Sequence, residues 1–295
     1  MGRRAEDRLS ALDDVLPVLR CPVCGAVLGP LEGDGGPRVL GCTAGHRFDV
    51  ARQGHVVLVP GGSRLRADTA AMVAARLRVM ASGTFDHVRA ALAGACAEAG
   101  TGTGLVLDLG AGPGTYTAAV LDALPLHQGL ALELSVPALR AAARAHPRLA
   151  AVGADLSRPL PLADGATGPD GVVTAVFAPL PGDDELARVS APGARLVVVT
   201  PTTAHLAGLR QRLDLLDVPA GKPERLQARL EPVWEPTGRH EVTAQVRLDP
   251  ALAGDVVAMG PNAWHTDDRL RAALADLPGA VDDTVAVTLS TFRRR

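Results

Sequence analysis

Residues 105–117 read LVLDLGAGPGTYT, and this stretch decides the fold of the chain. Its first five residues are apolar apart from Asp108, which is typical of a strand buried on both faces. Gly110, Gly112 and Gly114 follow, and glycine lets the backbone turn sharply and approach a ligand closely. A helix is then expected from residue 115, and its free N–H groups would attract a carboxylate or a phosphate. The stretch predicts a strand, a glycine turn and a helix that together form a ligand site.

The same alternation of apolar strands and helices extends through the C-terminal part of the chain. After the strand that enters the turn (105–112), further strands are predicted at 129–135, 149–155, 171–179 and 194–201. Helices are predicted at 115–124, 136–147, 183–190 and 203–217. Strands alternating with helices predict an α/β fold with a parallel, Rossmann-like sheet covered on both faces. The segments 241–249 and 283–292 are expected to end the sheet as an antiparallel pair.

Three acidic residues follow three successive predicted strands. Asp108 stands two residues before the first glycine, which gives the pattern DxGxGxG, while Glu133 and Asp155 end the next two strands. A dinucleotide site would instead read GxGxxG. We interpret the pattern as a site for S-adenosylmethionine (SAM), with Glu133 on the ribose hydroxyls and Asp155 on the adenine amine. A nicotinamide or flavin site, and acids that merely cap helices, are the alternatives.

Three of the four cysteines and a histidine form a second motif, in the stretch CPVCGAVLGPLEGDGGPRVLGCTAGH (21–46). Cys21 and Cys24 would form one knuckle, and Cys42 and His46 a second. Three thiolates with one imidazole suit the tetrahedral coordination of Zn²⁺. The turn formers at 29–37 let the chain fold back between two short strands, which predicts a zinc ribbon. A redox Cys-x2-Cys pair is the alternative, and Cys96 is expected in the core.

Length and composition indicate the domain organisation and the class of the protein. The chain has 295 residues, 47% of them hydrophobic, and a net charge of −2. We expect a zinc-binding module at 1–60, beginning with a polar, partly helical extension of about 20 residues. A helical linker at 61–100, with helices at 69–83 and 85–100, and a SAM-dependent methyltransferase domain at 101–295 would follow. No long apolar run or signal-peptide pattern occurs, so a cytoplasmic protein without a membrane partner is expected.

Positive charge is concentrated between Arg38 and Arg89. This part holds only three acidic residues against eight arginines: Arg38, Arg47, Arg52, Arg64, Arg66, Arg76, Arg78 and Arg89. A local basic surface can bind phosphates on a protein whose overall charge is near neutral. The concentration indicates an RNA-backbone contact, and a solvated helix face is the alternative.

The segment after the fourth strand of the sheet limits which kinds of atom could accept the methyl group. It reads VFAPLPG (176–182), where a methylase of exocyclic amines usually has Asn or Asp before Pro-Pro-aromatic. Phe177 and Ala178 offer no amide or carboxylate, and the cysteine that a pyrimidine-C5 methylase needs is absent. A ring nitrogen, an oxygen or a small molecule remains as the acceptor.

The whole set of motifs resembles the bacterial 23S rRNA (guanine-N1)-methyltransferases. The resemblance rests on the zinc ligands, HRFDVARQGHVVLVP (46–60), SGTF (82–85), DLGAGPGTYT (108–117), VVVTPTTAHL (197–206) and MGPNAW (259–264). It implies methylation of guanine N1 in a hairpin loop of 23S rRNA beside the macrolide-binding tunnel. It also implies tylosin-type macrolide resistance, if the chain lies in the resistance branch, which we favour.

The resemblance also assigns residues. Cys21, Cys24, Cys42 and His46 match the zinc ligands, and Gly112 and Pro113 match SAM contacts. Two further matches on the cofactor lie outside the glycine motif. Phe85 stands where the family commonly has a tyrosine, and His205 stands where the family's histidine approaches SAM. Tyr116 is expected near the site or in its packing.

The sequence leaves several residue roles, the oligomeric state and two rival functions undecided. No general base is identified; His265 is a candidate by residue type only, and Trp264 would stack on a base or on apolar surface. The partner expected is a 23S rRNA hairpin, and a homodimer is kept open. The rival functions are a small-molecule SAM-dependent methyltransferase and a binding protein with a degenerate SAM fold.

Overall fold

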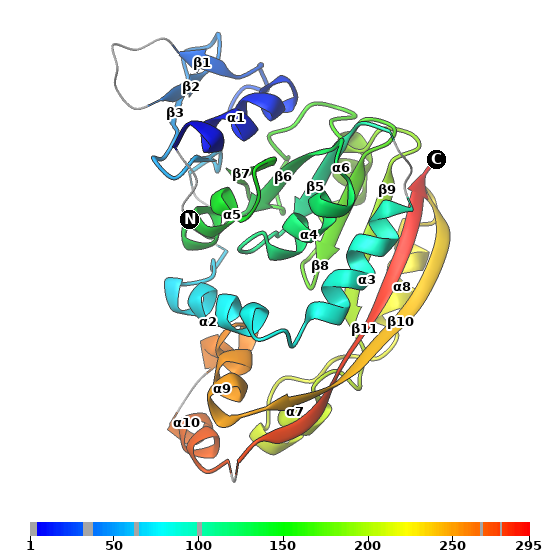
Figure 1. Ribbon diagram of the computed structural model, residues 1–295. Coiled ribbons are helices and arrows are strands. Elements are labelled where there is room, and N and C mark those ends of the chain that lie inside the picture. Colours follow the sequence, from blue (N-terminus) through cyan, green and yellow to red (C-terminus); the bar gives the residue numbers. More distant parts are fainter. Residues whose placement is uncertain (1–4, 32–37, 62–64, 99–101, 266–267, 278) are drawn as a thin grey trace.

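A computed structural model describes residues 5–31, 38–61, 65–98, 102–265, 268–277 and 279–295 (Figure 1). Its centre is an eight-stranded sheet in the order β10-β11-β9-β8-β5-β6-β7-β4. The five central strands are β5 (Leu105–Leu109), β6 (Gln128–Glu133), β7 (Leu149–Gly153), β8 (Val172–Val176) and β9 (Arg195–Pro201). They run parallel to one another, as predicted from their apolar composition.

Two long strands complete one edge of the sheet. β10 (Trp234–Leu248) and β11 (Val281–Arg294) pair antiparallel along almost their whole length. β11 also pairs antiparallel with β9, so it is inserted between the fifth central strand and β10. The predicted antiparallel pair is therefore confirmed, and both strands are longer than expected.

Helices cover both faces of the sheet (Figure 1). Those whose positions were predicted are α2 (Ala70–Ala81), α3 (Asp86–Ala97), α4 (Thr115–Ala123), α5 (Val136–Ala145), α6 (Asp183–Val189) and α7 (Ala207–Leu213). Three further helices were not predicted: α8 (Lys222–Leu230), α9 (Pro250–Ala258) and α10 (Asp268–Ala275). The start of α9 did carry a signal, because Asp249 caps it by accepting from Leu252 N–H and Pro250 stands at its first position.

Alternate residues of each strand enter two separate cores. On β5, Leu105, Leu107 and Leu109 pack in one core, while Val106 packs in the other with α3 and α4. Successive side chains of a strand point to opposite faces, so Asp108 lies on the same face as Val106. The strand alternation therefore aims Asp108 toward the helices that follow the glycine turn.

The N-terminal module is joined to the sheet rather than standing apart from it. β1 (Gly29–Leu31), β2 (Val39–Gly41) and β3 (Arg47–Asp49) form a small antiparallel sheet, but β4 (His55–Val57) pairs in parallel with β7. The predicted boundary at residue 60 stays a prediction, and β4 lies before it as an edge strand of the main sheet.

Residues 5–20 are partly helical, as expected, but they do not form a polar extension. Helix α1 (Ala5–Val15) and the 3-10 turn η1 (Leu16–Val18) bring Ala11, Leu12, Val15 and Leu19 into the core on one face of the main sheet. Positions 11, 12 and 15 lie on one face of the helix, and position 19 follows the helix on the same side. The extension is therefore part of the fold.

The helices of the described part of the chain were compared with the length and hydropathy of a membrane span. None of them meets both requirements.

Candidate functional site

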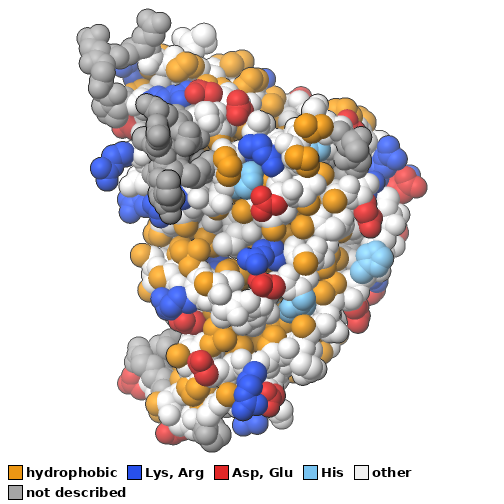
Figure 2. Space-filling view, in the orientation of Figure 1, with side chains coloured by type: hydrophobic (Ala, Val, Ile, Leu, Met, Phe, Trp, Pro, Cys, Tyr) orange, Lys and Arg blue, Asp and Glu red, His pale blue; other side chains and the backbone are white. Residues whose placement is uncertain are grey.

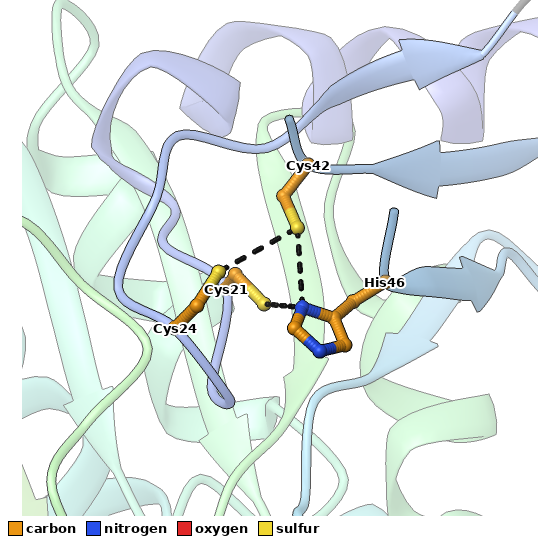
Figure 3. Close-up of side chains that lie close together, drawn as sticks. All are labelled: Cys21, Cys24, Cys42 and His46. Atoms are coloured by element: carbon orange, nitrogen blue, oxygen red, sulfur yellow. Dashed lines mark hydrogen bonds between the residues drawn. The ribbon is translucent and has the colours of Figure 1, made fainter. Parts of the chain in front are cut away.

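The two predicted knuckles meet at one point of the N-terminal module (Figure 3). His46 Nδ1 lies 3.5 Å from Cys21 Sγ and 3.3 Å from Cys42 Sγ, and Cys24 Sγ lies 3.6 Å from Cys42 Sγ. All four ligand atoms lie within 4.8 Å of one another. Backbone hydrogen bonds shape both knuckles, from Gly25 N–H to the Cys21 carbonyl and from Cys42 N–H to the His46 carbonyl.

These separations fit a zinc ion. Zn–S bonds of about 2.3 Å in a tetrahedron place neighbouring ligand atoms roughly 3.3–3.8 Å apart, since Zn–N bonds are shorter. Burial alone would raise the pKa of Cys42, but hydrogen bonds from the backbone and ring of His46 lower it to about 6. A thiolate at neutral pH is the form that binds metal. The four residues therefore suit Zn²⁺, and Cys96 is buried in α3 away from them, as expected.

A cavity of about 460 Å³ opens at the carboxyl ends of β5, β8 and β9. The glycine turn forms its floor, α2 and α9 lie on one side, and α7 with the segment before α8 lies on the other. Residues that line it include Arg76, Phe85, Asp108, Gly110, Gly112, Pro113, Tyr116, Phe177, Ala178, His205, Arg210, Asp217, Lys222 and Met259. Open parallel sheets bind their ligands at this edge.

The glycines of the turn have separate tasks. Gly110 and Gly112 line the cavity with φ of +70° and +55°, while Gly114 (φ +77°) precedes the first residue of α4. A Cβ on Gly110 would stand 2.7 Å from the methyl carbon of Ala178, so the turn and the segment after β8 approach as closely as their backbones allow. The sharp turn predicted for these glycines is therefore present, and their close approach to a ligand stays a prediction.

Asp108 is buried and lines the cavity. Its carboxylate accepts hydrogen bonds from the hydroxyls of Thr117, at 2.5 Å, and Thr174, at 2.9 Å. Burial raises the pKa of Asp108 to about 6, and the two hydroxyls only partly oppose the effect. Asp108 thus ties α4 and β8 to β5, and it carries a negative charge at neutral pH.

Glu133 and Asp155 stand at the predicted strand ends, but neither is among the residues that line the cavity. The Glu133 carboxylate accepts from the backbone N–H groups of Gly112, Leu134 and Ser135, each at 2.8 Å. Asp155 accepts from the backbone and hydroxyl of Ser157. In this state the acids shape the turns beside the site, and their predicted contacts with ribose and adenine stay predictions.

Phe85 and His205 are brought together with a residue that was not assigned to the site, Phe177. The ring centroids are 6.2 Å apart for Phe85 and Phe177, 6.0 Å for Phe85 and His205, and 5.6 Å for Phe177 and His205. All three residues line the cavity, so two segments that were assigned from the resemblance alone meet there.

His205 is neutral at physiological pH. Burial and the nearby Arg210 lower the pKa of His205 to about 4. Its Nδ1 accepts a hydrogen bond from Ala286 N–H at 3.3 Å, so the proton of the neutral ring resides on Nε2. His205 is therefore placed to donate a hydrogen bond, not to remove a proton.

Arg76 lines the cavity, although it was predicted only as part of the basic stretch. Its guanidinium bonds Asp68 and the Met259 carbonyl, both at 2.6 Å, and lies 3.1 Å from the position of a Cβ on Gly112. It thus joins α2 to the end of α9 directly over the glycine turn. Because Asp68 already pairs with this guanidinium, Arg76 fixes α2 against the turn and carries little free charge.

Tyr116 lines the cavity from the first turn of α4, which confirms that it lies near the site. Its hydroxyl is buried and has no hydrogen-bond partner in the described structure. A buried hydroxyl without a partner costs about 1–3 kcal/mol, so a ligand group or a water is expected to pair with it.

The expected basic surface is smaller than the sequence indicated. Among its arginines, four form ion pairs: Arg38 with Asp13, Arg76 with Asp68, Arg78 with Asp255 and Arg89 with Asp86. On the face shown in Figure 2, basic and acidic side chains are interspersed. Paired charges attract phosphate weakly, so any RNA contact must rely on other arginines of the stretch, such as Arg47 and Arg52.

The last two predicted residues are Trp264 and His265. The guanidinium of Arg66 lies over the Trp264 ring, 5.7 Å from the ring centroid. Trp264 remains 37% exposed. The side chain of His265 and the whole of Arg64 lie outside the described residues, so their predicted roles stay predictions.

Replacing Asp108 by asparagine tests the electrostatics of the cavity. The pKa of this carboxyl rises from 3.8 to about 6 on folding, so its contribution to stability is present below about pH 4 and is lost as the pH rises through 6. The variant should escape this loss, which is on the order of 3 kcal/mol at pH 7. It should also bind SAM, a cation at its sulfonium, more weakly.

Urea unfolding at pH 4, 5, 6 and 7 measures the effect as a difference between the two proteins. Protonation of His205 affects both equally and cancels in that difference. A constant difference over this range would show that Asp108 does not titrate there.

The strand order, with β11 inserted antiparallel beside β9, and the glycine turn under the cavity define a class I SAM-dependent methyltransferase. A zinc-ribbon family model described as RlmA, N-terminal, matches residues 19–64. The chain is 46% identical, over 95% of its length and 98% of the relative, to a protein of Micromonospora griseorubida named as a 23S rRNA (guanine-N(1)-)-methyltransferase. It is 43% identical, with the same coverage, to the 23S rRNA (guanine(748)-N(1))-methyltransferase of Streptomyces fradiae.

The chain therefore belongs to the family of 23S rRNA (guanine-N1)-methyltransferases, as its motifs indicated. Among solved structures, it is similar to a SAM-dependent methyltransferase from Geobacter sulfurreducens in complex with S-adenosyl-L-homocysteine. The TM-score is 0.41 and the identity 17%, over 69% of this chain and 90% of the other.

Proposed function

We propose that this enzyme transfers a methyl group from SAM to N1 of a guanine in a hairpin loop of 23S rRNA. The single observation that carries the proposal is the identity of 43–46% over 95% of the chain with the two relatives. The cavity supports it, because its glycine floor is joined to a second region that could receive a base. There Arg210 and Asp217 form an ion pair of 3.0 Å and Lys222 lines the wall.

SAM supplies an electrophilic methyl group, and the residues of the cavity hold the reacting groups in position. Gly110, Gly112 and Pro113 allow the cofactor close to the backbone, and Arg76 lies beside the same turn. Phe85 and neutral His205 wall the other side of this region, so no extra positive charge opposes the sulfonium. Most of the rate enhancement in such a transfer comes from this orientation of the reacting atoms.

The acceptor must also lose a proton, since N1 of neutral guanine carries one. His205 does not serve, because its free ring nitrogen is protonated. Among the residues that line the cavity, the Asp217 carboxylate accepts a hydrogen bond from Arg210 at 3.0 Å and remains exposed. A carboxylate accepts from both N1–H and the adjacent exocyclic amine of guanine, so Asp217 suits the Watson–Crick edge of the base.

Reverse transcription across 23S rRNA tests the proposed reaction. The protein is expressed in a host that lacks the modification, because a methyl group on N1 blocks base pairing and stops the polymerase. A new stop one nucleotide before a guanine in the tunnel-side hairpin is expected, at the nucleotide equivalent to 748 if the chain acts like the Streptomyces fradiae relative. If no new stop appears and the protein still binds SAM, a small molecule becomes the favoured acceptor.

Failure to bind SAM at millimolar concentration in a calorimeter would instead favour the binding-protein alternative. The stated biological role, resistance to tylosin-type macrolides, would appear as a raised inhibitory concentration in the same host. We also propose that the protein is cytoplasmic and that it forms a homodimer. Sedimentation of the purified protein tests the homodimer.

A further inference from the structure

Phe177 has a backbone conformation that side chains rarely adopt. Its φ is +56°, one of three non-glycine residues with positive φ in the described structure. Two neighbours enforce it: Phe177 N–H donates to the Val199 carbonyl at 3.1 Å, and the following Ala178 lies against Gly110. Left-handed residues with a side chain are strained, and such strain is often retained where a side chain must be aimed. The turn after β8 thus directs the Phe177 ring at a cost in stability.

The ring is directed toward the cavity and left partly open. Phe85 and Phe292 are both 2% exposed, as is usual for such a large apolar side chain, whereas Phe177 is 39% exposed. It lines the same cavity as the glycine turn. Leaving apolar surface uncovered gives up stabilisation from burial, so the exposure calls for an occupant.

Two cavity residues hold the ring in a fixed orientation. Phe85 meets it edge-on, with an interplanar angle of 84°, and His205 lies against it at 40°. Because His205 is neutral, this wall of the cavity carries no charge. A rigid, neutral aromatic surface with one part free suits a flat, uncharged ligand.

We propose that the exposed face of Phe177 is the stacking platform for the target guanine. The inference rests on the proposed function, since it names the surface that receives the base. A guanine whose N1 is methylated must leave its stack and its base pair. Stacking on an aromatic side chain compensates for that loss, as in many proteins that bind unstacked bases. Phe177, Gly110 and Asp217 line the same cavity, so a base stacked on Phe177 would share that cavity with the cofactor.

Phe177→Gly is the informative variant. Glycine adopts φ of +56° without strain, so the variant should fold at least as well as the native protein while lacking the ring. We expect SAM affinity within about twofold of native by calorimetry, and kcat/KM on a hairpin RNA lowered roughly tenfold to hundredfold. Phe177→Tyr keeps the aromatic face and should restore most of the activity.

A second readout follows the base itself. A hairpin with 2-aminopurine in place of the target guanine becomes brighter when the base leaves the stack, and an aromatic platform quenches it. The complex with Phe177→Gly should therefore be brighter than the complex with Phe177→Tyr.

The outcomes separate this inference from the proposed function. If the native protein methylates guanine N1 and Phe177→Gly is equally active, the platform assignment is overturned and the function stands. If Phe177→Gly loses SAM affinity in parallel with activity, the ring serves the cofactor and the assignment is again wrong. If the native protein does not methylate the RNA at all, the proposed function fails.

Discussion

Cys24→Ser should cost the protein its zinc and loosen the N-terminal module. Cys24 is exposed, so the change removes a ligand atom without disturbing packing. Structural zinc sites contribute about 10–16 kcal/mol of apparent binding free energy, most of which appears as folding free energy. The module shares its core with the main sheet through Leu28, Leu40 and α1, so the effect should reach the sheet edge at β4.

Zinc content by mass spectrometry and thermal unfolding measure the result. The native protein should retain one zinc per chain against a chelator concentration that strips the variant, and the variant should unfold at a lower temperature. The matched control is Cys96→Ala, which removes a buried sulfur in α3 that lies away from the cluster. It should lose some stability and keep its zinc. Retention of zinc by Cys24→Ser against the chelator would mean that these residues are not the metal site.

The zinc variant also tests what the module does for recognition. If Cys24→Ser, assayed below its unfolding temperature, still modifies RNA as the native protein does, the ribbon has no part in binding the RNA. Loss of RNA modification with SAM affinity intact would instead assign the module to the RNA, because none of the zinc ligands lines the cavity.

Gly110→Ala should abolish cofactor binding. The added methyl would stand 2.7 Å from the Ala178 methyl carbon, and both atoms are fixed to backbone. Left-handed φ costs about 1–2 kcal/mol for alanine, and overpacking a tight site adds about 1–3 kcal/mol. Relief requires the segment 177–179 to move, which shifts Phe177 and the cavity wall. We expect SAM affinity to fall roughly a hundredfold or more, since about 3 kcal/mol corresponds to that factor.

Gly168→Ala is the control for the backbone strain alone. Gly168 has φ of +72°, close to the +70° of Gly110, and an added Cβ meets nothing within 4 Å. It should therefore lose about 1–2 kcal/mol of stability and keep native SAM affinity. Equal loss of stability in both variants, with SAM affinity unchanged, would show that the close approach of Gly110 to Ala178 does not shape the site.

The sequence by itself determined the features that arise from local patterns. The five apolar strands were predictable because strands buried on both faces read as continuous apolar runs. The zinc ligands and the glycine turn were predictable because their chemistry requires given residue types at given short spacings. The antiparallel pair at the end was recognisable, although its two strands extend beyond the predicted segments.

Tertiary structure alone decided which of those residues face the cavity and which are already engaged. Arg78 pairs with Asp255, 177 residues away, and Arg76 reaches the Met259 carbonyl from 183 residues away. Asp255 offsets the charge of Arg78, and both partners hold in place side chains that look free and basic in the sequence. Glu133 is likewise engaged by the glycine turn, and β4 joins the main sheet from the zinc module.

Phe177 shows the same division most clearly. Its place after the fourth central strand was visible in the sequence, but its positive φ and its exposure were not. Both follow from the approach of Ala178 to Gly110, two segments whose distance is set only when the sheet assembles. Short-range patterns fix element type and ligand spacing, whereas side-chain partners between distant segments are set by packing, which one sequence does not encode locally.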